Sequence, residues 1–274
     1  MEEVLSKFIP DFHLENMERD KEISKSLIMT LFEEKINISS SPFISFILEY
    51  YLKHNDKNKY KVILLGEKES LNYYSVIGRK FGINLLKNNN DFVFVDINGA
   101  YSRLLKTQLP LEENVPDSYN QVRKGKDEYI ECDHKLLMND DINAFYKNTF
   151  DKIKEFINEN KKKENDKDKK YIIIFDMIND GCLKAFDDFL KFCFISEINL
   201  IFSINNELNS EKLVKYIEYL SDILIKIKSN ESGFSKDISG ILDIIIKKEF
   251  NEDLKSFRYN LKTNDIKIFS HIEI

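Results

Sequence analysis

Short apolar runs alternate with amphipathic stretches over most of this chain of 274 residues. Residues 26–32 form a nearly continuous apolar run, which is typical of a strand that is covered on both faces. The same pattern predicts further strands at 61–65, 92–96, 171–176, 200–203 and 222–227. Because amphipathic helical stretches separate these runs, the pattern predicts a mainly parallel sheet with helices on both faces.

Two of the predicted helices have a serine at their start. Ser41 can cap a helix in which Pro42 takes the first position, where its missing N–H costs nothing. Ser70 can cap a second helix, and Gly82 is placed to end it. Apolar residues at helical spacing predict other helices at 142–158 and around 183–190 and 213–217. Strands and helices thus follow one another as repeated units.

The C-terminal part of the chain changes its pattern. Three apolar runs follow one another there without helices between them, at 239–246, 257–261 and 266–269. A turn is predicted at 263–265, between the second and the third run. Parallel units followed by such an antiparallel extension describe the RecA-like P-loop NTPase fold. We expect one such domain over residues 26–274, preceded by an N-terminal arm at 1–25.

Two segments carry little periodicity. Residues 101–139 are expected to be a long connection. Residues 159–170 are a charged insert in which lysines alternate with acids, which is typical of a solvated spacer.

The loop after the first predicted strand differs from a phosphate loop. The motif G-x-x-x-x-G-K-[ST] needs glycines, so that backbone N–H groups can turn inward, and a lysine for the outer phosphates. No glycine precedes Gly66, and the loop contains Lys35 followed by Ile36 behind two glutamates. Such a loop would repel a triphosphate. The sequence therefore predicts a nucleotide fold without a working nucleotide site.

Two aspartates, Asp96 and Asp176, end strands at the edge where ligands of parallel sheets gather. With Lys35 they are the candidates for a divergent NTPase, in which the acids would bind magnesium or activate water. The alternative, which we favour, is that Asp176 is a relic of the fold that accepts hydrogen bonds from loop amides at the head of residues 179–181.

Two further loops, at 177–181 and 205–210, would face the pore if the protein formed a RecA-like ring. The second loop contains Asn205, Asn206 and Asn209, which can hydrogen-bond to RNA but are also ordinary turn residues. The pair Tyr73 and Tyr74 could stack on a base, although Tyr74 lies on the inward stripe of its helix.

Composition excludes several classes of function. A formal net charge of -6 argues against a protein that binds nucleic acid without basic partner proteins. The three cysteines, Cys132, Cys182 and Cys193, lack metal-ligand spacing, so neither a metal nor a disulfide is expected. No apolar run reaches about 18 residues, and the acidic start does not resemble a signal peptide. We expect an intracellular protein without a membrane-spanning helix.

Taken in order, several segments resemble the family of the sixth subunit of the Elongator complex. They are residues 62–65, 71–74, Gly78 with 80–85, 92–96, Gly233 with 237–240, 257–259 and 266–269. The match extends from about residue 61 to residue 269, with a poorly matched middle.

This resemblance implies a non-catalytic accessory subunit that needs no cofactor. It implies a heterohexameric ring with the fourth and fifth subunits, which contacts tRNA and supports modification of the wobble uridine (U34) at carbon five. The chemistry would belong to the catalytic subcomplex. The resemblance also implies a cytoplasmic location, with a nuclear one left open. A divergent NTPase, or a recombinase-like paralogue acting on nucleic acid, is the alternative.

Overall fold

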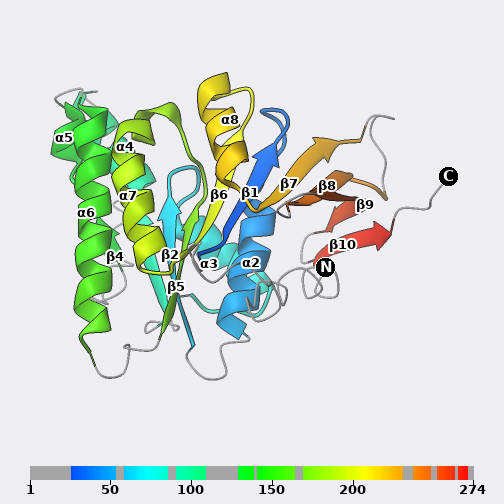
Figure 1. The fold of residues 1–274 in the computed structure, drawn as a ribbon, viewed down its shortest axis with the longest axis horizontal. Coiled ribbons are helices and arrows are strands. Elements are labelled where there is room, and N and C mark those ends of the chain that lie inside the picture. The colour runs from blue at the N-terminus through cyan, green and yellow to red at the C-terminus, as the bar shows by residue number, and fades with distance from the viewer. Residues whose placement is uncertain are drawn as a thin grey trace.

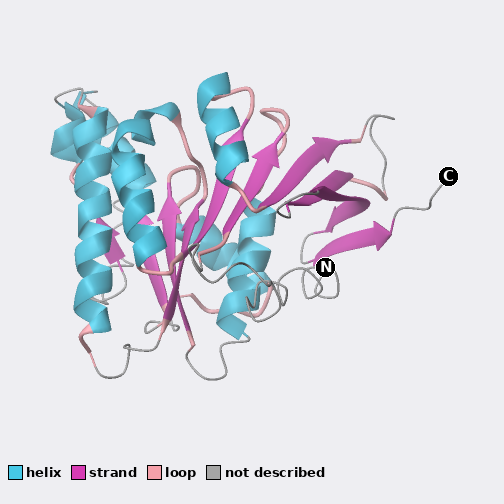
Figure 2. Ribbon diagram, in the orientation of Figure 1, coloured by secondary structure: helices cyan, strands magenta, loops and turns pink. Residues whose placement is uncertain are grey.

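The protein is represented by a computed structural model that describes residues 26–53, 59–85, 91–108, 129–138, 141–163, 169–230, 237–247, 252–262 and 265–270. Within these ranges, the strands form one sheet in the order β10-β9-β8-β7-β1-β6-β5-β2-β3-β4. Helices pack on both of its faces (Figures 1 and 2). The expected N-terminal arm at 1–25 lies outside the described residues.

The parallel part of the sheet contains the strands predicted from the apolar runs. β1 (Ile28–Glu33) lies between β6 and β7 and runs parallel to both. The other parallel strands are β2 (Tyr60–Gly66), β3 (Phe92–Asp96), β4 (Tyr129–Glu131), β5 (Lys170–Phe175), β6 (Asn199–Asn205) and β7 (Ile223–Ser229). All six residues of β1 are buried, as the continuous apolar run predicts for a central strand.

The helices divide between the two faces. On one face, α2 (Ser41–Lys53) and α3 (Leu71–Lys80) share a core with Met29 and Leu31 of β1. The opposite face packs on Ile28 and Phe32, as the alternation of side chains along a strand requires. It is covered by α4 (Ile97–Gln108), α5 (His134–Met138), α6 (Ile142–Lys161), α7 (Leu183–Ile195) and α8 (Glu211–Leu220).

The C-terminal strands form the predicted antiparallel extension. β8 (Gly240–Lys247) pairs with β7, β9 (Glu252–Lys262) with β8, and β10 (Asp265–Ser270) with β9. In Figure 1 these strands spread at the right, away from α5 and α6. They are joined to the helical layer by Tyr259, whose ring meets that of Phe43 in α2 edge-on at a centroid distance of 5.3 Å.

The helix caps are confirmed in part. The Ser70 side chain accepts the Tyr73 N–H at the start of α3, and Gly82 takes a φ of 81° just after its end. The predicted start of α2 is wrong by one residue. The helix begins at Ser41, because the carbonyl of Ser40 already accepts the N–H of Phe43 at 2.8 Å.

The long connection expected at 101–139 contains regular elements that the sequence did not predict. Its first part continues α4 to Gln108, and β4 and α5 lie nearer its end. β4 and α5 are too short to show a period, and β4 is specified by pairing with β3 rather than by its own sequence. Residues 109–128 and, within the charged insert, 164–168 lie outside the described ranges. None of the described helices is both long and apolar enough to cross a membrane.

Candidate functional site

The carboxyl ends of the parallel strands meet at one edge of the sheet, where neighbouring strands feed helices on opposite faces. β2 leads into α3 on one face, whereas its neighbour β5 leads, through a 3-10 turn (Asp180–Cys182), into α7 on the other. β1 and β6 diverge in the same way into α2 and α8. Ligands of open parallel sheets bind at such switch points. We therefore take this edge as the candidate site.

The loop between β1 and α2 has the length of a phosphate loop but not its chemistry. From the last residue of β1 to the residue before α2 the chain runs 33–40, which matches the spacing of G-x-x-x-x-G-K-[ST]. In this register, Glu33 and Ile38 stand at the glycines and Ser39 stands at the lysine. Only Ser40 fits the motif.

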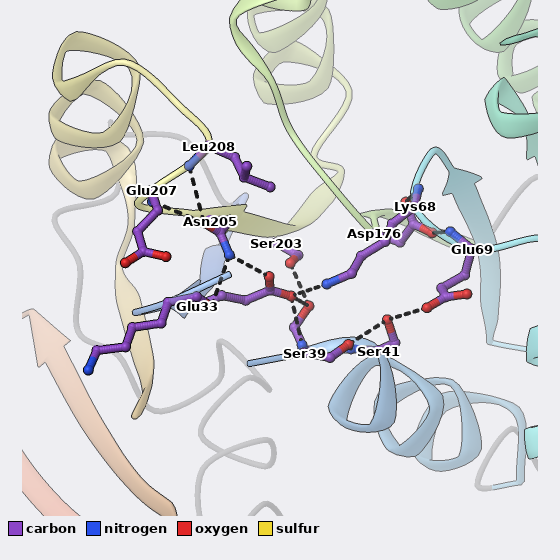
Figure 3. Close-up of polar contacts among 12 residues, drawn as sticks. Glu33, Ser39, Ser41, Lys68, Glu69, Asp176, Ser203, Asn205, Glu207 and Leu208 are labelled. Atoms are coloured by element: carbon purple, nitrogen blue, oxygen red, sulfur yellow. Dashed lines mark hydrogen bonds and ion pairs between the residues drawn. The ribbon is translucent and has the colours of Figure 1, made fainter. Parts of the chain in front are cut away.

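Glu33 is the centre of this loop. Its side chain is 1% exposed, and its Oε1 accepts the backbone N–H of Ser40 at 2.7 Å and the Ser40 hydroxyl at 2.7 Å. The ammonium group of Lys68, from the loop after β2, lies 2.7 Å from the same oxygen. Figure 3 shows Lys68 reaching across the edge toward Glu33. A glutamate carboxylate thus lies at the amino end of α2, where a helix favours negative charge.

Two further residues complete the hydrogen bonds around Glu33. Asn205 donates from Nδ2 to its Oε2 at 3.1 Å. The Ser203 hydroxyl lies 2.5 Å from that of Ser40 and donates to it, because the Ser40 hydrogen is used for Glu33. The end of β6 is thereby tied to the loop after β1.

Asp176, directly after β5, binds the loop after β2. Its Oδ1 accepts the backbone N–H groups of Glu67 at 2.7 Å and Lys68 at 3.0 Å. Its Oδ2 accepts the backbone N–H of Glu69 at 2.8 Å and the hydroxyl of Tyr74 at 3.2 Å. Burial raises the pKa of Asp176 to about 6, against the opposing effect of these donors. The amides belong to the loop after β2 and not, as we expected, to the loop that Asp176 heads.

Asp96, at the end of β3, has separate partners. Its Oδ1 accepts the N–H of Gly99 at 2.8 Å, and its Oδ2 accepts the Tyr129 hydroxyl. The guanidinium of Arg103 lies 3.5 Å from Oδ2. These contacts fix the first turn of α4 and the edge strand β4.

Lys35, the third residue of the hypothetical NTPase set, has an exposed side chain. Its carbonyl accepts the N–H of Ile38 at 3.0 Å. Within the described part of the chain, no hydrogen bond or ion pair joins Lys35, Asp96 and Asp176 to one another. In the sheet, β6 separates β1 from β5, and β2 separates β5 from β3.

A further acidic residue at this edge, Glu67, was not identified as a candidate in the sequence analysis. The Tyr146 hydroxyl donates to its Oε2 at 2.9 Å, and Asn179 donates to its Oε1. Asn179 also donates to the Tyr146 oxygen at 2.8 Å, and the hydroxyl of Tyr101 lies 3.4 Å from it. Burial raises the pKa of Glu67 to about 8. The hydrogen bonds from Tyr146 and Asn179 oppose this effect of burial on the pKa.

Asn205 is structural in its observed position. It is 1% exposed, and besides Glu33 it donates to the Lys35 carbonyl at 3.1 Å. Its Oδ1 accepts the N–H groups of Glu207 at 2.9 Å and Leu208 at 3.2 Å (Figure 3). This side chain, one of the three asparagines considered for an RNA contact, holds the loop after β1 and the loop after β6 together.

Asn206 and Asn209 differ from Asn205. Asn206 is exposed, while its backbone N–H donates to the Glu33 carbonyl at 3.1 Å. Asn209 is half-buried and donates from Nδ2 to the Asn205 carbonyl at 2.9 Å. Of the three, Asn206 is the side chain that is open to solvent.

Tyr74 lies in the core, and the half-buried Tyr73 packs against it. Tyr74 is 1% exposed, and its ring meets that of Tyr73 edge-on at 5.3 Å. The described residues contain no group of three His, Cys, Asp or Glu side chains that could hold a metal ion. Cys132 is buried, which raises its pKa to about 12.

The topology and this edge define a RecA-like α/β protein. An uncharacterized protein of Pyrococcus horikoshii, solved in complex with an unknown peptide, shares the fold with a TM-score of 0.58 at 12% identity, over 95% of this chain and 97% of that one. A KaiC-like protein of Pyrococcus horikoshii OT3 gives a TM-score of 0.46 at 11% identity, over 90% of each chain.

The sequence places the chain in a particular family. The family pattern described as Elongation complex protein 6 matches residues 37–265, so the chain belongs to that family. The Elongator complex protein 6 of Dictyostelium discoideum is 28% identical over 255 residues, which cover 76% of this chain and 75% of that protein. The resemblance found in the sequence is thereby confirmed.

The fit between Asp96 and α4 leads to a first prediction. A Cβ on Gly99 would lie 1.8 Å from Oδ2 of Asp96, so Gly99→Ala should lower the free energy of unfolding by roughly 1–3 kcal/mol. Gly78→Ala is the matched control, because its Cβ would meet its nearest neighbours at 3.5 Å and α3 should gain roughly 0.5–1 kcal/mol. Urea unfolding checks both. Equal stability of the two variants would contradict this packing.

The Glu67 cluster predicts a pH dependence. Because the folded pKa of about 8 exceeds the ordinary value of 4.5, the folded state holds this proton more tightly than the unfolded state. The contribution of Glu67 to the free energy of unfolding should therefore fall as pH rises from about 4.5 through about 8. Glu67→Gln should remove this slope in urea titrations at several pH values. Glu155→Gln, on the exposed side of α6, should leave it unchanged, and an unaltered slope in Glu67→Gln would refute the assignment.

Proposed function

We propose that this protein is a non-catalytic accessory subunit of the Elongator complex. It assembles with the fourth and fifth subunits into a heterohexameric ring, and the ring binds tRNA and supports modification of the wobble uridine at carbon five. The catalytic subcomplex performs the chemistry, and the complex works in the cytoplasm. Membership in the Elongation complex protein 6 family supports the first part of this proposal.

The observation that carries the non-catalytic assignment is the position of Glu33. Its buried carboxylate accepts hydrogen bonds at the amino end of α2, where a phosphate loop would present its donors to a nucleotide. A phosphate placed there would meet a like charge and would find the donors already in use. The loop therefore supports assembly rather than turnover.

Asp176 supports the same conclusion. In a P-loop ATPase, an aspartate after the corresponding strand holds magnesium. Here both carboxylate oxygens accept bonds from backbone amides or Tyr74. Releasing the aspartate to a metal would leave three buried or half-buried N–H groups without their acceptor. Its role is to hold the loop after β2.

For the tRNA contact, we propose the loop after β6, with Asn206 as the side chain that faces the ligand. Asn205 supports this loop from below, and Asn209 ties its far end to the Asn205 carbonyl. Asparagine can bond to sugar and phosphate oxygens without a net charge, which suits a chain whose formal charge is -6.

Co-expression of the full chain with the fourth and fifth subunits tests the proposal. Light scattering should show a stable assembly with the mass of a heterohexamer, and the purified assembly should retain tRNA on a filter. A chain that stays monomeric beside both partners would overturn the ring. Recovery of DNA-repair proteins instead of Elongator subunits in affinity purification would favour the recombinase-like alternative.

A further inference from the structure

The donors around Glu33 come from three separate loops. Ser40 supplies a backbone N–H and a hydroxyl from the loop after β1, and Lys68 supplies an ammonium group from the loop after β2, each 2.7 Å from Oε1. Asn205 supplies an amide from the end of β6, 3.1 Å from Oε2. These donors converge on a side chain that is 1% exposed (Figure 3).

This set of donors is the kind that binds phosphate in proteins. It combines a helix N-terminus, a lysine, a hydroxyl and a carboxamide around one point. The lysine differs in origin from that of a P-loop, because it reaches the site from the loop after β2 while Ser39 stands at the motif position. The cage is therefore complete without the motif lysine.

We propose that Glu33 is a built-in ligand that fills an anion site, and that this site binds inorganic phosphate once the Glu33 side chain is removed. The inference deepens the non-catalytic role proposed above for the same loop and is independent of the ring and of tRNA. In the natural protein the Glu33 carboxylate occupies the anion site. It thereby holds the three chain segments in the arrangement that a bound phosphate would otherwise impose.

The energetic reason lies in the buried donors. Glu33→Ala removes the acceptor of the buried Ser40 N–H, of the partly exposed Lys68 ammonium group and of the Asn205 amide, which keeps its bond to the Lys35 carbonyl. Leaving a buried donor such as the Ser40 N–H unpaired is costly. The substitution also removes Cγ, Cδ and both carboxylate oxygens of Glu33 from the position toward which these donors point. An added anion can then satisfy the donors and should stabilise the folded chain by mass action.

One competitor lies at the rim of the site. The carboxylate of Glu69 accepts a bond from the Ser41 hydroxyl at 3.3 Å, and burial raises its pKa. Lys68 could turn to this group after Glu33 is removed. The proposal requires that Lys68 remain at the site and contribute to phosphate binding, which a double variant can test.

The experiment measures phosphate binding by the full chain, using ³¹P NMR and thermal unfolding in phosphate or in chloride of equal ionic strength. Glu33→Ala should bind one phosphate and melt higher in phosphate than in chloride. Adding Lys68→Ala should weaken the binding about tenfold or more, as loss of one charge-assisted hydrogen bond predicts. The natural protein and Glu34→Ala, the matched loss of the neighbouring acid, should not respond to phosphate.

Three results would overturn the proposal. One is a folded Glu33→Ala chain that does not respond to phosphate. Another is equal phosphate binding with and without Lys68, which would mean an adventitious ion only. If Glu33→Ala is unfolded in chloride, adding phosphate should refold it. Glu33→Ser, which retains a hydroxyl beside Ser40, is the second variant. If neither variant folds or binds phosphate when phosphate is added, the proposal is also refuted. Assembly with the other subunits is measured separately, so either proposal can fail alone.

Discussion

The buried carboxylate of Glu33 is the contact on which the functional edge of this protein depends. A charged group with 1% exposure is tolerated only when donors surround it, and those donors come from the loops after β1, β2 and β6. The three loops are consequently fixed relative to one another without any bound molecule. Asp176 adds a second anchor by accepting three consecutive amides of the loop after β2.

Glu33 and Asp176 stand where proteins of this fold bind a nucleotide and its metal, but they bind loops of the chain instead. In a nucleotide-binding relative of this fold, the helix N-terminus and the strand-end aspartate would serve phosphate and magnesium. Here both serve the chain itself. The described sheet and helices keep the RecA-like arrangement around this edge, which suits the assembly role proposed above. Membership in the Elongation complex protein 6 family agrees with that use of the fold.

Much of the fold could be predicted from the sequence because local patterns specify it. The strand Phe92–Asp96 is found with the predicted bounds, and the antiparallel extension follows from three successive apolar runs. The short elements β4 and α5 escaped prediction, since they depend on neighbours rather than on their own period. The absence of glycines drew attention to the loop after β1, but it did not indicate the contacts that Glu33 makes there.

The site itself depends on contacts between distant positions. Lys68 lies in an ordinary charged turn, and nothing near it in the sequence indicates that it meets Glu33. In the sequence Asn205 resembles a polar loop residue. In the structure its side chain is buried, where it forms hydrogen bonds to the loop after β1 and to the loop after β6. Glu33 directly follows the apolar run predicted at 26–32, and this position was a signal, because an acid at the end of a buried strand needs a partner. The most direct measurement is calorimetry of magnesium-ATP with the natural full chain: the account predicts no binding heat, and micromolar, magnesium-dependent binding would contradict it.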